Sequence, residues 1–224
     1  MRHTSNKAAA LFVAALLIFS LTSCGLSDSF LASLGFDLHD YAGETVITQL
    51  DAGSEAASKL IGMIGMLTSE TPNLTKFTSP REAVSLYRDS ILTSMLSANF
   101  ARYSCDDDRM HRAVEAYPRM EITVLIPAEE FENTVYTNFG GSDKIAHADG
   151  LLFTYLDKVS AYTCVTAPTP AKAEIEVVSL GETENTYKLK FRVHSGEQIS
   201  PVYSALAIKR EDGTVYIKTI EEDK

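Results

Sequence analysis

The sequence predicts an α+β fold in which helices come first and pack on a curved antiparallel sheet. Before His147 most apolar residues recur every three or four positions, the period of an amphipathic helix. After His147 apolar and polar residues alternate, the period of a strand. Short polar turns join the alternating segments, which favours an antiparallel meander. One face of this sheet must be covered, and the preceding helices are the segments that can cover it.

Two helices are predicted in the first half of the chain. Residues 54–67 carry apolar side chains at helical spacing. The second helix begins at Ser79-Pro80-Arg81-Glu82, a capping box with proline at a position that needs no donor. Its apolar stripe reaches Phe100, so we expect the helix to continue to Tyr103 and to end near the acidic residues 106–108.

The middle of the chain predicts one strand followed by one helix. Residues 120–127, MEITVLIP, alternate like a strand. Residues 127–141 then predict a helix, because Glu129 and Glu130 suit the positive end of its dipole and Gly140 suits its carboxyl end.

The remaining segments predict the meander. Strands are expected within residues 151–156, 160–165, 173–180, 186–194, 202–210 and 214–220. In segment 186–194 the inward side chains are Tyr187, Leu189, Phe191 and Val193. Asp212-Gly213 predicts a hairpin turn between the last two strands.

The amino-terminal segment is typical of an export signal. Arg2 and Lys7 precede an uncharged run from residue 8 to 21, which is shorter than the ~20 apolar residues that span a bilayer. Leu21-Thr22-Ser23-Cys24 then resembles the lipobox of bacterial lipoproteins. This resemblance implies cleavage before Cys24, a diacylglycerol with palmitate-type acyl chains on its sulfur and a place on the outer face of the bacterial cytoplasmic membrane. An ordinary secretory signal and an uncleaved anchor are the alternatives.

This interpretation divides the chain into three parts. We expect a signal peptide in residues 1–23, a lipid-anchored tether with a short helix in residues 24–78 and a folded domain in residues 79–224. Without residues 1–23 the chain has 18 basic and 30 acidic residues, a formal charge of −12. Such a surface argues against nucleic acid as a partner, and it implies that the lipid attaches the protein to the membrane.

Two cysteines follow the lipobox. An exported protein meets oxidising conditions, so Cys105 and Cys164 are predicted to form a disulfide. The alternative is that both remain free thiols.

The order of elements resembles the NTF2-like (cystatin-like) group, a cone-shaped α+β fold, over residues 80–222. More narrowly, IPAEEFENTVYTNFGG, AHADGLLFTYL and AYTC resemble a family of uncharacterised lipoproteins of anaerobic Gram-positive bacteria. The narrow resemblance carries no activity to transfer. The NTF2-like group includes isomerases, dehydratases and binding modules, so fold by itself does not predict function.

Residues 139–150 hold the densest set of polar groups. Asp143, His147 and Asp149 have side chains that can act as base, proton shuttle and orienting carboxylate, and Tyr155 can add a donor. Three interpretations are open: catalysis, contact with a ligand or partner, and a structural turn.

A second polar cluster offers metal ligands. Asp106, Asp107, Asp108 and His111 supply oxygens and a nitrogen, but without the ligand spacing of an EF-hand or a zinc site. A solvated helix terminus explains the same residues. No motif predicts a cofactor.

The leading functional prediction is a cell-surface lipoprotein with a non-catalytic domain that binds an envelope protein, a peptide or a small molecule. The first alternative is an enzyme of the isomerase or dehydratase type with an acid-base group in the cone. The second is a structural subunit of an envelope complex. The resemblance to NTF2-like domains, which often pair through their sheets, implies a homodimer as one such assembly.

Overall fold

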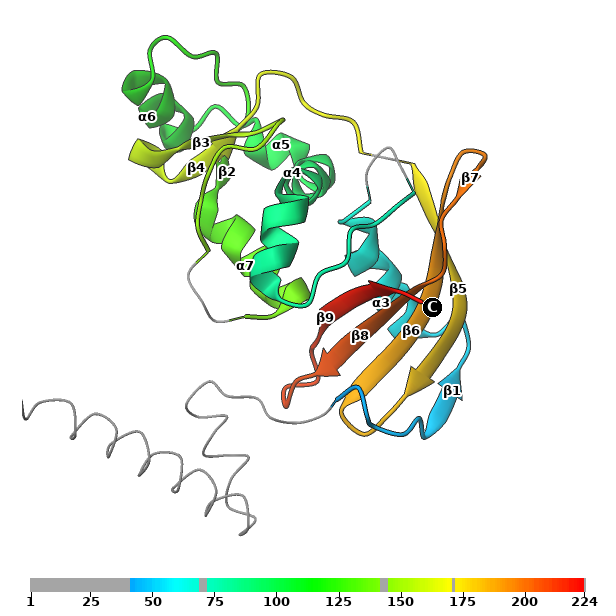
Figure 1. The fold of residues 1–224 in the computed structure, drawn as a ribbon. Coiled ribbons are helices and arrows are strands. Elements are labelled where there is room, and N and C mark those ends of the chain that lie inside the picture. Colours follow the sequence, from blue (N-terminus) through cyan, green and yellow to red (C-terminus); the bar gives the residue numbers. More distant parts are fainter. Residues whose placement is uncertain (1–40, 69–71, 142–144, 171, 224) are drawn as a thin grey trace, which may run out of the picture. The chain divides into compact units, whose positions relative to one another are not determined.

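A computed structural model describes residues 41–68, 72–141, 145–170 and 172–223 (Figure 1). Every element below belongs to one compact unit, residues 44–224. The predicted signal peptide and Cys24 lie outside the described residues. None of the helices in the described ranges is long and apolar enough to cross a membrane.

This unit includes two elements, β1 and α3, that precede residue 79, where the folded domain was expected to begin. Strand β1 (Thr48–Leu50) pairs with the main sheet, and helix α3 (Glu55–Gly65) buries Leu60 and Ile64 in the core. The helix was predicted, but not its place in the core. A helix of this length is marginal by itself in water, so it needs a partner for its apolar side.

The capping box starts α4 (Pro80–Ala98) as predicted. The Ser79 hydroxyl accepts the Glu82 N–H at 3.3 Å, and the Glu82 carboxylate reaches back to the Thr78 N–H at 2.7 Å. The helix ends earlier than expected, because Asn99 leaves helical geometry before the short α5 (Phe100–Tyr103).

A helix that the sequence did not predict follows. The carboxylate of Asp107 accepts the N–H groups of Arg109 and Met110 at 3.0 and 3.1 Å and so caps α6 (Asp108–Ala116). The acidic residues 106–108 were expected near the end of a helix. They lie instead at the start of one.

Helix α7 (Ala128–Phe139) agrees with its prediction and ends at Gly140. Gly140 has φ +74°, and a Cβ at this position would lie 2.5 Å from the ring of Tyr216. Glycine is thus required both by the backbone and by the strand that passes beside the end of the helix.

The main sheet is antiparallel, with strand order β1-β5-β6-β8-β9. Strands β5 to β9 form the expected meander, and the hairpin turn contains Gly213 at φ +79°. Leu189, Phe191 and Val193 face the core as predicted, and Tyr187 packs on its margin. The strand bounds are β5 (Ala173–Glu182), β6 (Thr186–Ser195), β7 (Gln198–Ile199, paired with β6), β8 (Tyr203–Lys209) and β9 (Val215–Glu222).

Two of the strands expected in the meander, within residues 151–156 and 160–165, instead belong to a second sheet with order β2-β4-β3. It consists of β2 (Ile126–Pro127), β3 (Thr154–Leu156) and β4 (Ala161–Thr163), with the 3-10 turn η1 (Asp157–Val159) between the last two. Only the last two residues of the expected strand 120–127 pair in it. The Leu125 N–H bonds instead to the Tyr103 carbonyl at 2.8 Å, so the carboxyl end of α5 takes the place of a neighbouring strand.

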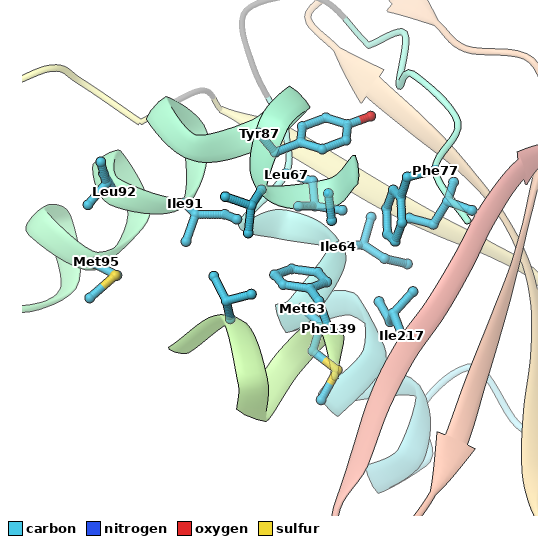
Figure 2. Close-up of a cluster of buried hydrophobic side chains, with 14 of the residues drawn as sticks. Met63, Ile64, Leu67, Phe77, Tyr87, Ile91, Leu92, Met95, Phe139 and Ile217 are labelled. Carbon is cyan, nitrogen blue, oxygen red and sulfur yellow. The ribbon is translucent and has the colours of Figure 1, made fainter. Parts of the chain in front are cut away.

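One hydrophobic core joins α3, α4 and α7 to the main sheet (Figure 2). The Phe77 ring packs edge-on against Phe139 and Tyr87, with centroids 6.2 and 6.1 Å away. The Phe77 backbone also exchanges hydrogen bonds with Ile220 at the edge of β9. The side chains labelled in the figure are Met63, Ile64, Leu67, Phe77, Tyr87, Ile91, Leu92, Met95, Phe139 and Ile217.

A smaller cluster holds α6 against the second sheet (Figure 1). Its buried members are Met110, Ala113, Leu125, Leu156 and Ala161. This packing positions one face of α6 beside η1.

Candidate functional site

A groove of about 460 Å³ lies between the first turns of α4 and the end of α7. Its volume is within the usual range for small-molecule sites. The described residues that line it are Ser79, Pro80, Arg81, Val84, Ser85, Arg88, Val135, Tyr136, Gly141, Ile145 and Ala146.

Two guanidinium groups provide the charge of the groove. Arg81 and Arg88 project from α4, two helical turns apart. Arg88 is held in place by the carbonyl oxygens of Ala146 (3.1 Å) and Asp149 (3.4 Å). Neither arginine has a carboxylate within ion-pair distance in the part of the chain that the structure describes. The groove therefore presents positive charge that the described residues leave uncompensated.

The rest of the groove is mainly apolar. Val84 of α4, Val135 of α7, Pro80 and Ile145 contribute apolar surface to its lining. The serines at positions 79 and 85 add hydroxyl groups near the arginines. A ligand with an anionic group and an apolar body would match both parts.

His147, beside the groove residue Ala146, has partners at both ring nitrogens. Nδ1 lies 2.9 Å from the Tyr162 hydroxyl, and Nε2 lies 3.0 Å from Glu132 Oε1 on α7. The Tyr155 ring stacks on the imidazole, with centroids 4.8 Å apart. An ionised Glu132 requires Nε2 to carry a proton, so in the neutral ring Nδ1 accepts from Tyr162.

This arrangement suits a structural network better than acid-base catalysis. Burial raises the pKa of Tyr162 to about 12, so its hydroxyl keeps its proton and remains a donor at neutral pH. The His147 side chain is only 12% exposed, and both of its nitrogens are already hydrogen-bonded. A substrate therefore finds no unused ring nitrogen in this conformation.

The described residues that were predicted for this site, His147, Asp149 and Tyr155, have different roles in the structure. His147 and Tyr155 are brought together, but Tyr155 contributes a stacked ring and its hydroxyl is not the partner of His147. Asp149 Oδ1 accepts the Tyr155 N–H at 2.8 Å and so orders the backbone. Asp143 lies outside the described residues.

Sequence reasoning missed Glu132. It precedes His147 by fifteen residues and is one of several acidic residues on α7. The helical phase could have indicated it, since Glu132 lies four residues after the buried Ala128 and three before the buried Val135 and thus shares their side of the helix.

The loop after His147 is held by α4. Asp89 Oδ2 accepts the N–H groups of Leu151 (2.6 Å) and Leu152 (3.3 Å). Gly150 passes so close that a Cβ there would lie 2.1 Å from Asp89 Oδ1. Gly150 therefore leaves the space that the Asp89 carboxylate occupies.

The predicted disulfide is not formed. Cys105 is an exposed free thiol after α5, and Cys164 is a buried free thiol after β4. Burial raises the pKa of the Cys164 thiol. The two residues lie in different environments because Cys164 is part of the main core, whereas Cys105 lies in the exposed connection to α6.

The candidate metal ligands lie at the start of α6. His111 Nε2 lies 2.8 Å from Asp106 Oδ1 on the exposed surface, Asp107 caps the helix and Asp108 is its first residue. Within the described ranges there is no group of three His, Cys, Asp or Glu side chains that could hold a metal ion.

Comparisons of the chain with models of protein families, with curated proteins and with solved structures found no match. The resemblances to lipoproteins and to the NTF2-like group therefore stay predictions from the sequence.

Proposed function

We propose that this protein is an exported, lipid-anchored binding protein whose groove between α4 and α7 holds a small ligand with one anionic group and an apolar body. One observation carries this proposal: Arg81 and Arg88 lack carboxylate partners in the described part of the chain and face a groove with an apolar wall. An anion there would gain charge-assisted hydrogen bonds without displacing an existing ion pair.

The proposed location rests on the sequence Leu21-Thr22-Ser23-Cys24 behind an uncharged run. A diacylglycerol on Cys24 would attach the chain to the outer face of the bacterial cytoplasmic membrane. We also propose that the domain is a variant of the NTF2-like fold. Helices that precede an antiparallel meander support this assignment, and the sheet β2-β4-β3 would be an addition to it.

Binding accounts for the groove better than catalysis. The described lining contains no Asp, Glu, His or Cys side chain. General acid-base chemistry near neutral pH uses such groups within hydrogen-bond reach of the substrate. Arginine remains protonated and suits anion binding.

The test is calorimetric titration of the full chain in dodecyl maltoside micelles with hexanoate, hexan-1-ol and hexylamine. We expect hexanoate to bind more tightly than the alcohol and the amine not to bind. Arg81→Gln should weaken hexanoate binding about tenfold, the effect of one charge-assisted hydrogen bond. Arg81 is exposed, so this change should leave the melting temperature unaltered.

Arg119→Gln is the matched control, because Arg119 is exposed and does not line the groove. It should bind hexanoate like the unmodified chain. Equal binding of hexanoate and hexan-1-ol, or equal losses in the two variants, would contradict the proposed site.

A further inference from the structure

A second groove, of about 380 Å³, lies between α6 and the turn η1. It shares no lining residue with the groove between α4 and α7. Three of its lining side chains are cationic: Arg109, Arg112 and Lys158. The other described lining residues are Leu125, Pro127, Val159, Ser160 and Ala161.

We propose that this second groove binds a phosphate-bearing anion, either a soluble phosphate or the phosphate of a lipid headgroup. Arg109, Arg112 and Lys158 would surround the phosphate oxygens. The proposal is independent of the ligand of the first groove.

Two of the three cations are positioned by neighbouring groups. Asp107 accepts from Nε and Nη2 of Arg109 at 3.0 and 2.8 Å. Lys158 Nζ donates to the Ala116 carbonyl at 3.3 Å and lies 5.2 Å from the centroid of the Tyr117 ring. The contacts of Lys158 link η1 to the end of α6. Because Arg109 and Lys158 are already held by neighbours, less side-chain entropy is lost when an anion binds.

Arg112 is the cation that remains available. It lies one turn after Arg109 on α6, so the two side chains share a face of the helix. Arg112 is exposed and has no hydrogen bond or ion pair in the part of the chain that the structure covers. Its planar fork can therefore donate to two oxygens of one phosphate.

The charges of the site favour a phosphate. Four hydrogen bonds, two to backbone N–H groups and two to Arg109, already use the carboxylate of Asp107. Asp107 thus offsets Arg109, which also has Glu130 at 4.0 Å, while no acidic side chain is among the described lining residues. The charge of Arg112 remains, whereas the neighbouring Asp157 carboxylate, whose pKa is lowered first by its hydrogen bond from Tyr117 and also by the charge of Lys158, offsets Lys158 in part. The positive charge that is left favours an anion such as phosphate.

The negative charge of the whole chain does not prevent such binding. Charges farther away than the Debye length, about 8 Å at physiological ionic strength, are largely screened. Apolar residues such as Leu125, Val159 and Ala161 form part of the wall, which strengthens the local attraction.

The experiment uses the full chain in dodecyl maltoside, which contains no phosphate. Inorganic phosphate and glycerophosphoglycerol are titrated in solution, and phosphatidylglycerol is titrated in mixed micelles. We expect inorganic phosphate to bind, and Arg112→Gln to weaken its binding about tenfold. Arg112→Lys should recover part of the lost phosphate affinity, because lysine restores the positive charge but not the planar guanidinium that donates two hydrogen bonds to one phosphate.

Arg119→Gln removes the same charge outside the groove and should leave phosphate binding unchanged. Tighter binding of phosphatidylglycerol than of glycerophosphoglycerol would assign the site to lipid headgroups, and equal or weaker binding would assign it to soluble phosphates. Absence of phosphate binding, or equal weakening by Arg112→Gln and Arg119→Gln, would overturn the proposal.

Discussion

Glu132 Oε1 on α7 and His147 Nε2, fifteen residues later in the chain, lie 3.0 Å apart. This contact ties the segment after α7 back to the helix. Through Nδ1 the same imidazole reaches Tyr162 of β4. The side chain that the sequence singled out for proton transfer thus joins a helix, a loop and the second sheet.

Glu132→Ala should lower the free energy of unfolding by about 1 to 2 kcal/mol, because Nε2 of the mostly buried His147 would lose its acceptor. Chemical denaturation followed by circular dichroism measures this loss. Glu129→Ala is the control, since Glu129 is exposed on the same helix and should cost only a few tenths of a kcal/mol. Equal losses in the two variants would show that the contact with His147 adds nothing to stability.

Gly150→Ala should destabilise the protein because its Cβ would lie 2.1 Å from Asp89 Oδ1. The loss should exceed about 2 kcal/mol, since the Asp89 carboxylate is held by two backbone N–H groups and cannot move away freely. Denaturation curves of Gly150→Ala, Asp89→Ala and the double variant form a cycle. In the Asp89→Ala background the added cost of Gly150→Ala should largely disappear, and full additivity would refute the steric explanation.

The two thiols should react very differently. Cys105 is exposed and should be alkylated by iodoacetamide in the native protein within minutes, whereas buried Cys164 should react only after unfolding. Its burial also keeps Cys164 in the less reactive thiol form, because burial raises its pKa. Mass spectrometry of the unreduced protein checks both statements. A mass two units lower with neither thiol alkylated would indicate the disulfide that the structure lacks.

Lipidation at Cys24 is the prediction on which the proposed location depends. Cells that express the protein should incorporate radiolabelled palmitate into it, and Cys24→Ser should abolish the label. Cys105→Ser provides the matched control and should keep the label in full. An unlabelled protein with the leader still attached would rule out both the lipid anchor and the proposed location.

Features that depend on neighbours along the chain could be predicted from the residues. The capping box at Ser79, the end of α7 at Gly140 and the hairpin turn at Gly213 follow from local backbone chemistry. The inward residues of β6 follow from its period of two. These signals indicated an α+β fold with helices before a meander, since each depends on interactions within a few residues.

Features that depend on distant segments could not be predicted and are seen in the folded chain alone. The second sheet, the place of α3 in the core and the two grooves all bring together residues far apart in sequence. No local pattern marks Glu132 as the partner of His147, or Asp89 as the reason for Gly150. Periodicity shows which side of an element is apolar, but it contains no information on which other element covers that side.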